Sequence, residues 1–140
     1  MATYDFEIGV IGGGAAGLTV TAGAAQLGAR TLLIEKEPSL GGDCLHVGCV
    51  PSKTLINTAH AYHQLERTKD FGLPEVKAGP VNFSLVAERI RSVIATIQVH
   101  DSVERFCKLG AQVEFGEAEF IDEHSVRLNG AVKSAKYWVI

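Results

Sequence analysis

Residues 6–17 read Phe-Glu-Ile-Gly-Val-Ile-Gly-Gly-Gly-Ala-Ala-Gly, a short apolar run that leads into closely spaced glycines. The run Phe6–Ile11 predicts a β-strand, and the residues from about 15 to 27 predict a helix that Gly28 ends. The pattern G-x-G-x-x-G lies between them, at Gly12, Gly14 and Gly17. Such a turn lets the backbone approach a pyrophosphate and places its charge at a helix N-terminus. We therefore expect a dinucleotide site at this turn.

A second strand at Thr31–Ile34 completes a β-α-β unit, which predicts a right-handed parallel crossover. Glu35 ends this strand, roughly 20 residues after the glycines, where an acid binds a ribose diol and repels a 2′-phosphate. The expected dinucleotide contacts in this part of the chain are Gly12, Gly13, Gly14, Ala15, Ala16, Gly17, Glu35 and Lys36. The motif does not separate FAD from NAD, because both contain ADP.

Composition is typical of one folded domain: the 140 residues are 46% hydrophobic and 21% charged, with a formal charge of -3. Without a basic face, nucleic acid and an anionic membrane surface are poor candidate partners. Residues 8–29 carry little charge and could imitate a membrane helix, but each of the glycines at 12–14 disfavours helix by roughly 1 kcal/mol. The N-terminus has no secretory or transit pattern, so we expect a cytoplasmic protein.

Cys44 and Cys49 form a C-x4-C pair followed by Val-Pro-Ser-Lys, ending at Lys53. In a regular helix, residues five apart are separated by about 7.5 Å along the axis, whereas a disulfide needs Cα atoms within about 7 Å. Gly48 permits the irregular backbone that would bring the sulfurs together. Cys49 lies ahead of a helix that Pro51 opens, whose dipole favours a thiolate. A redox pair is favoured over three alternatives: a zinc site that adds nearby histidines, two unreactive buried thiols, or an inert disulfide.

The rest of the chain predicts a helix to about residue 69 and a long helix over about 84–109. Four short strands are expected at 112–115, 118–121, 125–128 and 136–140, with a hairpin turn at Asn129-Gly130. We expect Cys107 to be a small buried residue and His46 to be a solvent-facing spacer. The final residues resemble a buried core strand, so we expect residues 1–140 to be part of a longer protein.

The segment Gly-Gly-Asp-Cys-Leu-His-Val-Gly-Cys-Val-Pro-Ser-Lys at residues 41–53 closely resembles the flavin-dependent pyridine nucleotide-disulfide oxidoreductases. The resemblance extends over essentially all 140 residues and favours FAD as the bound dinucleotide. It implies a three-layer α/β domain with a central parallel sheet and a small antiparallel β-meander. Residues 1–140 would be the first part of the FAD-binding domain, and the rest of that domain, an NAD(P) domain and a dimerisation domain would follow.

The resemblance also implies roles for individual residues. Cys49 would face the flavin, Cys44 would exchange with the acceptor, and Lys53 would lie near flavin N5. Further FAD contacts would come from Gly41, Gly42, Asp43, Cys49, Lys53, Glu117 and Ala118. No resident metal is expected.

The expected reaction carries electrons from NAD(P)H through FAD to the cysteine pair and on to a small acceptor, in a homodimer. Position 43 is usually Thr in lipoamide dehydrogenases and glutathione reductases, and the Asp found here is more similar to mercuric reductases. We therefore favour an Hg(II) acceptor, with dihydrolipoamide dehydrogenase or glutathione reductase activity as the alternative. A non-catalytic FAD-binding or thiol metal-binding module is the alternative from another class.

Overall fold

Four parallel strands form the centre of the fold in a computed structural model that describes residues 3–140. Across the sheet they run β3 (Ala111–Phe115), β2 (Thr31–Glu35), β1 (Phe6–Ile11) and β6 (Ala131–Val139). Helix α1 (Ala15–Gln26) connects β1 to β2, as the β-α-β pattern predicts. The expected parallel α/β sheet is therefore confirmed.

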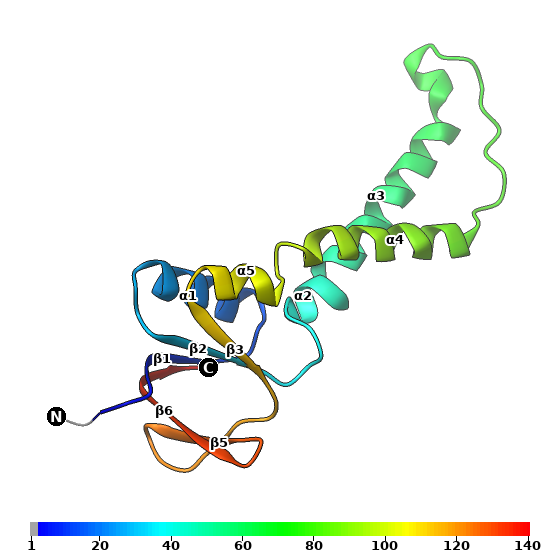
Figure 1. The fold of residues 1–140 in the computed structure, drawn as a ribbon. Coiled ribbons are helices and arrows are strands. Elements are labelled where there is room, and N and C mark those ends of the chain that lie inside the picture. The colour runs from blue at the N-terminus through cyan, green and yellow to red at the C-terminus, as the bar shows by residue number, and fades with distance from the viewer. Residues whose placement is uncertain (1–2) are drawn as a thin grey trace.

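Strand β6 belongs to two sheets. Its second half pairs in parallel with β1, whereas its first half pairs antiparallel with β5 (Ser125–Leu128), which in turn pairs with β4 (Glu119–Phe120). Figure 1 shows α1 and α5 (Val103–Lys108) on one face of the parallel strands and this meander on the other. The three expected layers are present, and β6 connects two of them.

Strand β2 is buried along its whole length because both faces of the sheet are covered. Leu33 packs toward the helices, in a core with Val10, Leu18 and Phe106. The neighbouring residues of the strand point the other way and pack on the meander, beside Val126 and Leu128. Because successive side chains of β2 point to opposite faces of the sheet, this one strand contributes to two hydrophobic cores, one on each side.

A helical arm projects from the sheet (Figure 1). It contains α3 (Cys49–Glu66), the 3-10 helix η1 (Thr68–Phe71) and α4 (Phe83–Gln98), and α2 (Gly42–His46) lies at its base. Among residues 3–140, no helix is both long and apolar enough to cross a membrane.

Several predictions of local structure are wrong. The single helix expected over 84–109 is two helices, because the side chain of Ser102 accepts a hydrogen bond from the Arg105 N–H and starts α5 anew. Helix α2 precedes α3 as a separate element that the sequence did not predict, and β6 begins at Ala131 rather than near residue 136. Cys107 is exposed on α5, not buried.

The contact between α1 and β1 generates a stability prediction. A Cβ at Gly17 would overlap the carbonyl oxygen of Gly12, which belongs to the rigid turn. We expect Gly17→Ala to destabilise the fold by about 1–3 kcal/mol in urea unfolding. Gly23→Ala is the matched control on the same helix, since a Cβ there meets no atom within 4 Å. It should stabilise the fold by about 0.5–1 kcal/mol, and equal effects of the two variants would contradict the steric explanation.

Candidate dinucleotide and dithiol site

The glycine turn connects β1 to α1 with little side-chain bulk. Gly12 has a φ of 104°, in the left-handed region that favours glycine, and its N–H donates to the Ile34 carbonyl at 2.8 Å. Gly14 is the N-cap of α1 and supplies no side-chain cap, so Ala15 and Ala16 begin the helix with uncapped N–H groups. The turn therefore offers a free helix N-terminus to an anion, as its sequence predicts.

Glu35 is 5% exposed and ties this turn to β2. Its Oε2 accepts a hydrogen bond from the Gly13 N–H at 2.6 Å, and its Oε1 accepts one from the Glu37 N–H at 2.8 Å. Each carboxylate oxygen retains lone-pair capacity after these bonds. The carboxylate is thus oriented by the backbone and still able to accept hydrogen bonds from a diol.

A cavity of about 500 Å³ lies beside Glu35. The residues around it come from the ends of β1, β2 and β3 and from the start of α2. Seven of the predicted FAD contacts line it: Gly12, Glu35, Lys36, Gly42, Asp43, Glu117 and Ala118. The structure therefore brings together residues that lie more than 100 positions apart in the sequence.

The cysteine pair lies where two helices meet. Helix α2 carries Cys44 and ends at His46, and α3 begins at Cys49. Between them, Gly48 has a φ of -110° and a ψ of -104°, and its N–H donates to the Asp43 carbonyl at 2.6 Å. The irregular backbone predicted at Gly48 is confirmed.

The two thiols have different surroundings. Cys44 is half-buried and Cys49 is exposed, and both are free thiols in this structure. A hydrogen bond with the Cys49 side chain raises the pKa of the Cys44 thiol above its ordinary value. Burial and the charges of Cys49 and Asp101 raise it further, while the Cys49 backbone N–H acts in the opposite direction. In the reduced pair, Cys44 is therefore held toward its protonated form.

A second cavity, of about 420 Å³, opens beside Cys44. Its wall combines one face of α1 with α2 and the elbow between α4 and α5, and it is mostly apolar. Asp101 and Arg105 are the charged residues among those described around it. Sequence reasoning missed both residues, although the Asp101-Ser102 dipeptide, as a helix-start signal, could have located the elbow.

The predicted residues do not all line the cavity beside Glu35: Ala15 and Gly41 line the one beside Cys44, and Gly13, Gly14, Ala16, Gly17 and Cys49 line neither. Lys53 is exposed on α3 and lines neither of these two cavities. His46 is half-buried rather than solvent-facing: its Nε2 lies 3.0 Å from the Leu40 carbonyl and 3.2 Å from the Ser39 hydroxyl. The side chain of His46 therefore ties α2 to the preceding loop, and the proposed contact of Lys53 with flavin stays a prediction.

Comparison with known proteins assigns the family. The sequence matches the pyridine nucleotide-disulphide oxidoreductases over residues 6–140, and the chain belongs to that family. The fold resembles the HOCl-induced flavoprotein disulfide reductase RclA from Escherichia coli, with a TM-score of 0.75 and 26% identity. That match covers 94% of this chain and 27% of RclA.

Two curated relatives are dihydrolipoyl dehydrogenases. The protein from Geobacillus stearothermophilus is 38% identical over 134 residues, covering 91% of this chain and 27% of the relative. The mitochondrial protein from Schizosaccharomyces pombe is 34% identical over 131 residues, which cover 90% of this chain and 24% of the relative. The chain thus spans roughly a quarter of these relatives. They favour the dihydrolipoyl dehydrogenase alternative over the mercuric reductase-like activity expected from Asp43.

Members of this family bind FAD and use NAD(P)H. The residues present fit the ADP half of FAD, since the bare backbone of Gly12 and Gly42 and the buried Glu35 carboxylate line one cavity. The uncapped N-terminus of α1 follows the same glycine turn. Gly42 also approaches Gly14 so closely that a Cβ on Gly42 would lie 2.7 Å from the Gly14 Cα. Within residues 3–140, no cluster of three or more His, Cys, Asp or Glu side chains is arranged to hold a metal ion.

The unequal thiols generate a pH prediction. In the reduced protein, Cys49→Ala removes the hydrogen bond and the charge that raise the pKa of Cys44. The pKa of Cys44 should then fall toward its ordinary value, and alkylation of Cys44 by iodoacetamide at neutral pH should be a few-fold faster, because the thiolate is the nucleophile. The pH profile of alkylation, resolved by peptide mass spectrometry, measures this shift. Cys107 is exposed on α5 and serves as the internal reference, whose profile should not change.

Proposed function

We propose that this chain is the FAD-binding and dithiol-bearing part of an NAD(P)H-dependent disulfide oxidoreductase. The observation that carries the proposal is the position of the Cys44 and Cys49 segment beside both cavities. Gly42 and Asp43 line the cavity of the glycine turn, and Cys44 lines the apolar one. A single short segment thus adjoins the proposed cofactor site and the proposed acceptor site.

On this proposal, the residues of the first cavity hold FAD. The N-terminus of α1 binds the pyrophosphate, Glu35 accepts hydrogen bonds from the ribose, and residues 116–118 face the adenine. Bound FAD supplies two-electron transfer from NAD(P)H to a disulfide. The NAD(P) site would come from sequence outside this chain, in keeping with its coverage of roughly a quarter of the relatives.

The chain's own cysteines perform thiol-disulfide exchange. The Cys44 thiolate attacks one sulfur of the acceptor disulfide, forms a mixed disulfide and releases the other sulfur as a thiolate, which takes up a proton. The Cys49 thiolate then attacks the Cys44 sulfur, and the second acceptor sulfur leaves as a thiolate, which takes up a proton. The acceptor disulfide gains two electrons and two protons, and the cysteine pair becomes a disulfide. Each step is reversible, so the same residues can oxidise a dithiol.

A small neutral disulfide or dithiol of the lipoamide type is the acceptor that we propose. The cavity beside Cys44 is mainly apolar, which suits a short hydrocarbon chain better than the charged ends of glutathione. The curated relatives named dihydrolipoyl dehydrogenase support the same class. We further propose that the complete protein is a cytoplasmic homodimer.

The test uses the complete protein with NADH or NADPH and three acceptors: lipoamide, glutathione disulfide and Hg(II). We expect lipoamide to give the highest kcat/KM. Cys44→Ser should abolish lipoamide reduction, by more than a hundredfold, because no thiolate remains to attack the disulfide. Reduction of ferricyanide, which can take electrons without the cysteines, should persist within about twofold and serves as the control.

Two outcomes of this test would change the proposal in different ways. Protein that retains no FAD after purification or after addition of FAD contradicts the oxidoreductase proposal and favours a non-catalytic thiol module. Faster turnover of Hg(II) than of lipoamide would retain the mechanism and replace the acceptor class.

A further inference from the structure

Asn129 occupies the tight turn between β5 and β6 and has a role beyond that turn. Its φ is 51° and that of Gly130 is 81°, the two left-handed residues that a two-residue hairpin of the common primed type requires. Asn, Asp and Gly all tolerate this backbone conformation. The turn therefore explains why a residue of this kind stands at position 129, but it does not require a side-chain amide.

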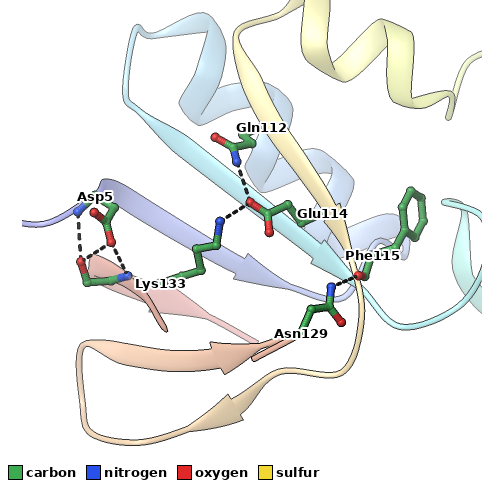
Figure 2. Close-up of polar contacts among 7 residues, drawn as sticks. Asp5, Gln112, Glu114, Phe115, Asn129 and Lys133 are labelled. Atoms are coloured by element: carbon green, nitrogen blue, oxygen red, sulfur yellow. Dashed lines mark hydrogen bonds and ion pairs between the residues drawn. The ribbon is translucent and has the colours of Figure 1, made fainter. Parts of the chain in front are cut away.

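The Asn129 amide makes a contact far along the chain. As Figure 2 shows, its Nδ2 donates a hydrogen bond to the carbonyl of Phe115, the last residue of β3, at 2.8 Å. The same amide packs against Gly116, where a Cβ would come within 2.6 Å of the Asn129 Oδ1. The hairpin turn thus contacts the peptide at the end of β3 through one side chain.

That peptide leads into one wall of the dinucleotide cavity. Gly116, Glu117 and Ala118 line the cavity, whereas Asn129 does not. On its other side the segment is attached to β2, because the Gly116 N–H donates to the Glu35 carbonyl at 2.8 Å. The wall is therefore held between the strand that carries the proposed ribose carboxylate and the Asn129 amide.

An ion pair between β6 and β3 holds the hairpin against β3, and a hydrogen bond within β3 orients its carboxylate. Lys133, on β6, places its Nζ 2.6 Å from a carboxylate oxygen of Glu114, and Gln112 donates to the same oxygen at 2.6 Å (Figure 2). The side chains of Lys133 and Glu114 are each 23% exposed, so this pair is partly shielded from solvent. Asn129 thus acts from a hairpin that is already attached to β3, and its amide is directed at the cavity wall.

We propose that Asn129 is a positioning residue for the adenosine half of the bound dinucleotide, acting through the Phe115–Ala118 segment. The inference rests on the proposed function, which places the adenine beside residues 116–118. Without the amide, this glycine-containing segment loses its restraint on the hairpin side and must be ordered when the ligand binds. Ordering of a loop at binding lowers affinity.

The test compares two substitutions that remove the amide donor and keep the turn, Asn129→Asp and Asn129→Gly. The probes are ADP, which contains the adenosine and pyrophosphate groups, and FAD. We expect the Kd for ADP to rise roughly threefold to tenfold in both variants, the size expected for one lost hydrogen bond. The same lost hydrogen bond should also lower the midpoint of urea unfolding without ligand, but by no more than the backbone strain of Gly130→Ala lowers it.

Gly130→Ala is the matched control, because it strains the backbone at Gly130, whose φ is positive, and leaves the Asn129 amide in place. It should lower the unfolding midpoint while the Kd for ADP stays within about twofold. An unchanged Kd in both Asn129 variants, or a Kd that rises as much in Gly130→Ala, overturns the inference and leaves the proposed function standing. If the unaltered protein binds neither ADP nor FAD, the proposed function itself is wrong.

Discussion

The close approach of α1 to the end of β1 is the constraint on which the rest of the structure depends. Gly17 permits it, because any side chain there would overlap the Gly12 carbonyl. Because the N-cap residue is Gly14, the N-terminal N–H groups of α1 have no side-chain cap at the point where β1 ends. The buried Glu35 carboxylate accepts a hydrogen bond from the Gly13 N–H. The geometry of the proposed dinucleotide site is thus a direct result of how the β-α-β unit packs.

Strand β6 extends this constraint to the other end of the chain. Because its two halves pair with different partners, the meander is fixed against the face of the sheet opposite to α1. The hairpin at one end of β6 therefore reaches β3, although two strands separate them in the sheet. Residues 116–118 line the same cavity as Gly12, and contacts from both β2 and the meander hold this segment.

The sequence predicts what local chemistry determines. The bounds of β1, the start of α1, the break at Gly48 and the turn at Asn129 all follow from residue type and spacing, and the structure confirms them. The apolar period through Ile97, Val103 and Phe106 continues without interruption, so it could not show that α4 packs on α3 while α5 packs on the sheet. Cys107 is exposed because it lies on α5, which is separated from α4 by the break between Gln98 and Val103. The long-range amide contacts of Gln98 with the Leu40 carbonyl and of Asn129 with Phe115 carry no signal in sequence spacing. Residue 43 alone was too little to identify an acceptor.

The segment from Gly41 to Cys49 connects the proposed cofactor site to the two thiols through backbone geometry. At one end, Gly41 donates to the Gly13 carbonyl at 2.8 Å, and Gly42 lies against Gly14. At the other end, the break at Gly48 brings Cys49 back beside Cys44, which a continuous helix would not allow, since its rise alone separates such residues by about 7.5 Å. The five-residue helix α2 lies between these contacts. The distance from the glycine turn to the thiols is therefore set by one short, doubly anchored piece of chain, and of the two thiols only Cys44 lines the apolar cavity.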